Sequence, residues 1–179
     1  MNPRLVKIFQ PIIQILAAIP PNIFYPLIAA FIAIYHQDLG WWAIPMIMLG
    51  TLWYVLFNVI AGVSAIPTQI TEVSETFGLR RFRWWRYYML PAIFPYIVTG
   101  IISAAGGAWN SAIAAEVIQW GSTTLSATGL GAFISVVTDA GKNPESALGC
   151  AAMCALVALC IIFVWQPLYR IAETKFKYD

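Results

Sequence analysis

Polar side chains interrupt several otherwise apolar stretches of the sequence, where their hydrogen-bonding groups could contact a solute. Thr99, Ser103 and Asn110 recur at a spacing that places them on one face of a helix. Thr51 and Asn58 form a similar stripe in an earlier stretch. Polar groups are costly inside a membrane, so each of these residues is a candidate for the lining of a solute path. Close packing of helices is the alternative, because small and weakly polar residues also serve that purpose.

Glu116 is the only acidic residue within these apolar stretches. It is a candidate for an outer gate or for pairing with another helix, and a position at the membrane interface is the alternative. The sequence shows no metal-ligand cluster and no nucleophile–base pair, and its only Gly-Lys pair, Gly141-Lys142, lacks the flanking residues of a phosphate-binding loop. We therefore expect a protein that is not an enzyme and that binds neither a metal nor a cofactor of its own.

The composition indicates which elements must position these residues. Of the 179 residues, 60% are hydrophobic and 10% are charged, whereas a soluble domain has about 25% charged residues. Four apolar stretches each exceed the roughly 20 residues that a helix needs to cross a bilayer. The expected fold is therefore all-α and integral to the membrane, a single domain over residues 1–179 with spans near 12–35, 41–66, 91–118 and 146–168. Pro20 and Pro21 are expected to interrupt the first span, because proline lacks a backbone donor.

The basic residues indicate how these spans are oriented. All of them except Lys142 lie near the N-terminus, in the connector 67–90 or near the C-terminus. Four spans place these three segments on one side of the membrane, which the positive-inside tendency makes the cytoplasm. We therefore expect a multi-pass protein of the cell (inner) membrane with both termini cytoplasmic and with the connector 119–145 outside, where 130–138 can form a short helix. Because the basic residues lie beside apolar spans, their expected partner is lipid and not nucleic acid.

The connector 67–90 contains the most specific motif of the sequence. A short helix is expected over 68–77, because a proline suits its first turn and Gly78 suits a left-handed C-terminal cap. The basic and aromatic stretch 79–89 predicts a second short helix at the level of the lipid headgroups. Pro91 is then placed where the third span can start. Two helices joined at a glycine outside the membrane would form a lever that a partner protein can move.

This connector resembles the cytoplasmic loop of the permease subunits of ABC importers of type I. That loop opens with Glu-Ala-Ala, has a glycine six residues after the glutamate and ends with Ile-x-Leu-Pro. The matching residues are Glu72, Gly78, Leu90 and Pro91. The departures are Val73 and Ser74 in place of the alanines and Tyr88 in place of the isoleucine. The resemblance implies an ATPase-coupling surface that consists of Glu72, Val73, Ser74, Glu75, Gly78, Leu90 and Pro91.

Further segments resemble the nitrate, sulfonate and taurine branch of this family. The proline-rich stretch 10–27 is similar to its opening helix, and 109–131 is similar to the C-terminal half of the duplicated anion-importer permeases. The resemblance implies a small, anionic solute, a partner ABC ATPase that uses ATP and magnesium, a second permease unit and an external solute-binding protein. It also implies a core that is incomplete at its N-terminal side, since the family's unit has at least one further helix before Pro11.

A different class of protein remains open from the residues themselves. Secondary transporters and channel-like membrane subunits also contain broken helices and polar groups near the middle of the membrane. Such a protein would need no ATPase and would use intramembrane ionisable residues for ion coupling, for which the sequence offers only Glu116.

Overall fold

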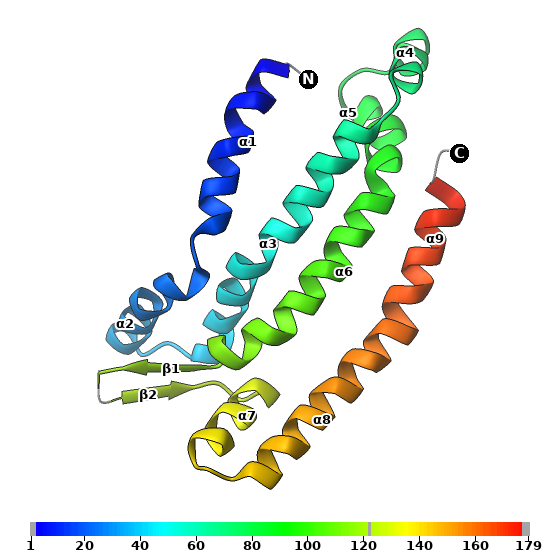
Figure 1. Cartoon of the computed structure of the whole chain (residues 1–179). Coiled ribbons are helices and arrows are strands. Elements are labelled where there is room, and N and C mark those ends of the chain that lie inside the picture. Colours follow the sequence, from blue (N-terminus) through cyan, green and yellow to red (C-terminus); the bar gives the residue numbers. More distant parts are fainter. Residues whose placement is uncertain (1–2, 122, 177–179) are drawn as a thin grey trace. The chain divides into compact units, whose positions relative to one another are not determined.

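The computed structural model describes residues 3–121 and 123–176, and helices dominate it (Figure 1). Contacts between residues divide the chain into two compact units. Unit 1 comprises residues 1–50 and 110–149, and unit 2 comprises residues 51–109 and 150–179.

Three helical runs in the described part of the chain are long and apolar enough to cross a membrane, namely Leu39–Ala65, Arg81–Ala115 and Asn143–Phe176. A fourth span exists if the bent pair Pro11–Ala18 and Pro21–Tyr35 is counted as one. In the apolar window of the last run only 11% of the residues are buried, so most of its side chains are free to face lipid or other chains. The expectation of an all-α, integral membrane fold is confirmed.

The first span in unit 1 is broken, as its paired prolines predict. Helix α1, Pro3–Ala18, ends before Pro20, whose backbone is extended. A short 3₁₀ turn, η1 (Pro21–Phe24), then leads into α2, Tyr25–Tyr35. The bend between the two arms measures 66° and is visible in Figure 1. The cause is local, because two consecutive residues without an N–H cannot continue the helical hydrogen bonds.

The rest of unit 1 is built around the start of α3, Leu39–Ala65, and the end of α6, Leu90–Ala115. The expectation that the third span reaches residue 118 is wrong. Strand β1, Val117–Trp120, instead pairs antiparallel with β2, Thr123–Ser126, and Gly121 between them has a positive φ of 59°. Such a φ suits a turn, and the pairing of β1 with β2 takes residues 117–120 out of the helix. The expected short helix is confirmed as α7, Leu130–Asp139, and its place outside the membrane stays a prediction.

Unit 2 contains the remainder of α3 and α6 and the elements of the connector. These are α4 (Thr68–Thr76), α5 (Arg81–Trp84) and the π-helical turn η2 (Trp85–Met89). Its last run consists of the rest of α8 (Asn143–Cys160), the π-helical turn η3 (Ile161–Trp165) and α9 (Gln166–Phe176). Tyr88, Met89 and Ile93 form its buried apolar cluster, against which the end of α3 packs.

Glycines bring α3 and α6 close together within unit 2. A Cβ added at Gly100 would lie 2.9 Å from the Cα of Val55, and one at Gly62 would lie 2.7 Å from the ring of Tyr96. Small residues at membrane helix interfaces permit this approach, where dispersion contacts replace the hydrophobic driving force.

Pro91 does not start a new helix, contrary to the expectation from its position. The helical run is continuous from Arg81 to Ala115, and the π turn η2 ends two residues before this proline. The second π turn, η3, likewise ends two residues before Pro167. A proline ring collides with the carbonyl of residue i−4 in a regular α-helix, and a wider turn at that place relieves the collision. The connector is therefore joined to the third span by helix and not by a hinge.

Candidate functional site: the connector helix and the polar face of α6

The connector helix α4 exposes most of the residues proposed for ATPase coupling. Glu72, Val73 and Glu75 are exposed, and Val73 is 52% accessible. The helix ends in a cap of the Schellman type, in which Leu79 N donates to Ser74 O at 3.1 Å and Gly78 N donates to Glu75 O at 2.9 Å. Gly78 has a φ of 63°, which confirms the expected left-handed cap. The cap turns the chain sharply between α4 and the basic stretch that follows.

The other proposed coupling residues lie differently. Ser74 is buried, at 3% exposure, and faces the inside of the connector. Leu90 is half exposed and Pro91 is partly buried, and both lie in the helical run beyond η2. Phe77 and Phe82 were not singled out from the sequence, yet they are 78% and 73% exposed. The signal available in the sequence was the presence of two phenylalanines in a connector that also contains four arginines. The structure shows that both rings are exposed, as the side chains of a protein-binding surface often are.

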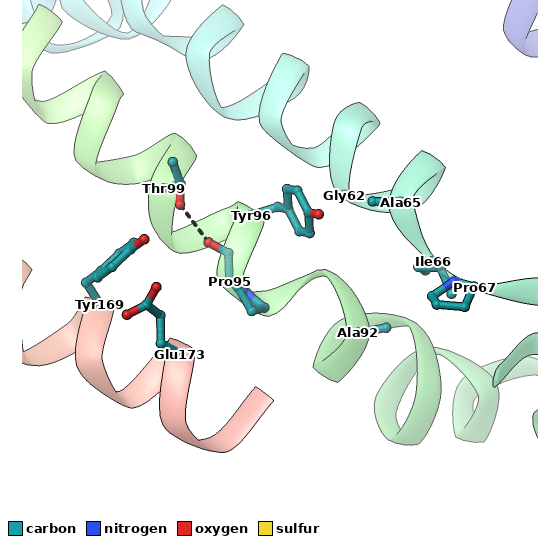
Figure 2. A pocket seen from close by; sticks show the side chains of 10 residues that line it. All are labelled: Gly62, Ala65, Ile66, Pro67, Ala92, Pro95, Tyr96, Thr99, Tyr169 and Glu173. Atoms are coloured by element: carbon teal, nitrogen blue, oxygen red, sulfur yellow. Dashed lines mark hydrogen bonds between the residues drawn. The ribbon is translucent and has the colours of Figure 1, made fainter. Parts of the chain in front are cut away.

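Thr99 and Ser103, two candidates for the solute path, lie exposed on α6 beside two cavities within unit 2. The first cavity has a volume of about 370 Å³ and the second about 390 Å³, and Thr99 lines both. Thr99 Oγ1 donates to Pro95 O at 3.0 Å, as Figure 2 shows, and Ser103 Oγ donates to Thr99 O at 3.0 Å. Both hydroxyls thus use their proton on their own helix and present acceptor lone pairs to the cavities.

Thr51 and Asn58 occupy a different place, at the contact between α3 and α6. Asn58 Nδ2 donates to Tyr54 O at 2.8 Å, and its Cβ lies 3.0 Å from where a Cβ of Gly100 would be. Thr51 is 8% exposed and lies beside Gly107. Asn110 is exposed on α6 in unit 1. The structure therefore brings Thr99 and Ser103 together at the cavities, and it places Thr51 and Asn58 against the neighbouring helix.

The sequence analysis did not identify the residues of the last helical run that line the cavities. Tyr169 lines both cavities, Glu173 lines the first and Arg170 lines the second (Figure 2 shows the first). Tyr96 of α6 also lines the first cavity. The available signal was a polar stripe at the end of the last apolar stretch, where Gln166, Tyr169, Arg170 and Glu173 recur at helical spacing.

Glu116 lies at the N-terminus of α7 in unit 1. Its Oε2 accepts a hydrogen bond from Ala132 N at 2.8 Å, and its backbone carbonyl accepts one from Ala127 N at 2.8 Å. The carboxylate occupies the space that a Cβ of Gly129 would fill. A Cβ at Gly131 would lie 2.8 Å from the backbone of Ala112, so α7 touches α6 directly. The helix N-terminus, with its unpaired N–H groups, is where a carboxylate is stabilised.

Removal of the Glu116 carboxylate is expected to loosen α7. Glu116→Ala leaves the Ala132 N–H without this acceptor, which should destabilise the start of α7 by about 1–2 kcal/mol. Glu116→Gln keeps an acceptor oxygen and should have a smaller effect. Hydrogen exchange of the peptide that covers residues 130–139 measures the difference, with Glu145→Ala as the control. Equal exchange in Glu116→Ala and the unsubstituted protein would contradict this role.

No three His, Cys, Asp or Glu side chains among residues 3–121 and 123–176 form a cluster that could hold a metal ion. The features found instead are several apolar membrane helices, a capped helix–glycine connector between two of them, and a polar helix face beside cavities. Together they define a multi-pass membrane protein of the transport type.

Comparison with known proteins gives the family. Residues 1–178 match the family described as the inner membrane component of binding-protein-dependent transport systems, and the chain belongs to this family of ABC importer permeases. It is 33% identical over 144 residues to the nitrate import permease protein NrtB of Leptolyngbya laminosa. This alignment covers 78% of this chain and 48% of NrtB. It is 32% identical over 133 residues to the bicarbonate transport system permease protein CmpB of a Synechocystis species, covering 74% of this chain and 44% of CmpB.

A more distant relative is the taurine transport system permease protein TauC of Escherichia coli, which is 26% identical over 118 residues, covering 66% of this chain and 42% of TauC. The chain spans about half the length of the curated relatives it matches. The resemblance seen in the connector motif is thereby confirmed at the level of the family.

Proposed function

We propose that this chain is the membrane-spanning subunit of an ATP-driven importer and that a separate ATPase binds its connector, α4 to η2. The observation that carries the proposal is the exposure of Val73, Phe77 and Phe82, which are 52%, 78% and 73% accessible. These apolar side chains lie in a connector rich in arginine, where a solvent-exposed apolar patch indicates a protein-binding surface. When the ATPase closes on ATP and magnesium, α4 moves, and the spans alternate between inward-open and outward-open states.

The proposed solute is a small anion. The family relatives are named for nitrate, bicarbonate and taurine, which share a small size and an anionic group. The hydroxyl protons of Thr99 and Ser103 are used within α6, so these residues offer an anion no donor. We assign the choice of solute to the external binding protein, while Arg170, which lines the second cavity together with Ser103, offers an anion a cationic donor on its passage.

The proposed assembly contains a second permease unit, and both termini face the cytoplasm. Many apolar side chains of α8 and η3 are exposed and must be covered by lipid or by other helices. Examples are Leu159, Ile162 and Phe163, which are 50%, 51% and 72% accessible. The alternative, an ion-coupled secondary transporter, requires an ionisable group that a coupling ion can reach. The match to the family of ABC importer permeases favours the ATP-driven alternative. Glu116, the acidic residue that the sequence offered for ion coupling, is held by the N-terminus of α7.

Placing a charge on the exposed face of α4 tests the proposal. In Val73→Asp the tagged protein should lose most of the nucleotide-binding subunit that co-purifies with it, because a buried unpaired carboxylate would be created at the interface. Val136→Asp, at a valine of α7 with the similar exposure of 50%, is the matched control and should retain the subunit. If no ATPase co-purifies with the unsubstituted protein from its own membrane, the proposal is wrong.

A further inference from the structure

Two departures from the permease loop motif, Ser74 and Tyr88, meet at the same residue of α4. The hydroxyls of Tyr88 and Thr71 lie 2.7 Å apart, a hydrogen bond between residues 17 positions apart in the sequence. Ser74 Oγ donates to the carbonyl of Thr71 at 2.7 Å. Thr71 therefore links the connector helix α4, through a side chain, to the π turn η2 at the start of the third span.

The surroundings make this link rigid. Tyr88 is 5% exposed and belongs to the buried apolar cluster of unit 2, where the rings of Tyr88 and Trp84 lie 5.3 Å apart. Ser74 is 3% exposed. A hydroxyl at such a buried position has a strong preference for its hydrogen-bond partner, because an unpaired polar group there is costly. Since η2 continues into α6 without a break, the hydrogen bond joins α4 to the helix that carries Thr99 and Ser103.

We propose that Thr71 and Tyr88, with Ser74 holding Thr71 from within α4, form a clasp that transmits the movement of the ATPase-bound α4 to α6. The proposal rests on the proposed function and specifies which residues carry the coupling. The exposed side chains of α4 receive the force, and the clasp on its buried side passes it on. These three are positioning residues, since none of them lines either cavity.

The test uses the double variant Thr71→Val with Tyr88→Phe. Both partners of the hydrogen bond become apolar groups of nearly the same shape, so the fold should be preserved, whereas Thr71→Val alone leaves the buried Tyr88 hydroxyl unpaired. The matched controls are Thr76→Val, at an exposed threonine of the same helix, and Tyr87→Phe, at a tyrosine that is 65% exposed. Neither control touches the clasp.

A fluorescent label at one of two positions measures whether the movement reaches α6. The measurement uses the complete complex purified from its own membrane. Cys150, Cys154 and Cys160 are first replaced by alanine, and a single cysteine is then placed at Gln69, an exposed residue of α4 outside the proposed docking residues, or at Ser103 on α6. Without the clasp substitutions, ATP with vanadate should change the signal at both positions. In the double variant the signal at position 69 should still change, and the change at position 103 should fall at least threefold.

The outcomes separate the two proposals. Equal changes at position 103 in the double variant and in the controls would overturn the clasp and leave the ATPase coupling standing. No change at position 69 without the clasp substitutions would overturn both, because no ATPase would then move α4. A loss at both positions in the double variant, with normal co-purification of the ATPase, would also overturn the clasp, since the residues would then be needed for the movement of α4 itself and not for its transmission to α6.

Discussion

Under the proposed function, Gly78→Val is expected to reduce ATP-dependent uptake about tenfold, with nitrate, bicarbonate and taurine as the test solutes. Gly78 has a φ of 63°, and a Cβ added there meets nothing within 4 Å, so the effect comes from the backbone alone. The left-handed conformation costs a residue with a side chain about 1–2 kcal/mol, and a β-branched residue is among the least suited to it. A penalty of that size shifts a conformational equilibrium roughly 5- to 30-fold. The chain at residue 78 would then leave the left-handed conformation of the cap, which fixes the direction between α4 and the stretch that follows it.

Two controls isolate the cause of this effect. Gly78→Asn should retain most of the uptake, because asparagine tolerates the left-handed region. Gly141→Val introduces the same strain, at a φ of 70°, in the turn that precedes α8 in unit 1, and should leave uptake and ATP hydrolysis nearly unchanged. Uptake and solute-stimulated ATP hydrolysis are measured in vesicles with equal amounts of complex. Full activity of Gly78→Val would show that the cap has no part in the coupling.

Gly100→Val is expected to destabilise the folded chain strongly. The added Cβ would lie 2.9 Å from the Cα of Val55 and 3.3 Å from the carbonyl oxygen of Tyr54, and backbone atoms cannot move aside as a side-chain tip can. The helices α3 and α6 would have to separate, and overpacking of this kind costs about 3 kcal/mol. The ratio of folded to unfolded protein should accordingly fall roughly a hundredfold.

Gly106→Val is the matched control for this experiment, because it lies on the same helix and a Cβ there meets nothing within 4 Å. Thermal unfolding in detergent and the monodisperse fraction in size-exclusion chromatography should be close to those of the unsubstituted protein for Gly106→Val and clearly lower for Gly100→Val. Similar stability of the two variants would show that α3 and α6 do not depend on contact at this glycine.

The elements with local causes were predictable from the sequence. The break before Pro21 follows from two residues without an N–H, and the cap at Gly78 follows from the conformational freedom of glycine. The long apolar helices follow from composition, which needs no knowledge of neighbours. The strand Val117–Trp120 was missed, because its stability comes from pairing with a second segment and not from its own periodicity.

The candidate site was predictable only in part, because its residues depend on what they face. Thr99 and Asn58 have the same kind of signal in the sequence, a polar side chain in an apolar stretch. In the structure Thr99 lines two cavities, whereas Asn58 bonds to its own helix at the contact with α6. Periodicity places residues on a face of a helix, but only the packing of helices decides whether that face is open or covered.

The sequence by itself determined that this protein spans a membrane, where most of its helices lie and that its connector has the permease motif. These properties depend on hydropathy and on the turn chemistry of Pro67 and Gly78, which act within a few residues. The tertiary structure alone decided that Tyr88 bonds to Thr71 and that Glu116 caps α7. These contacts join residues 17 and 16 positions apart, and they exist because a buried polar group must find its partner wherever the fold brings one within reach.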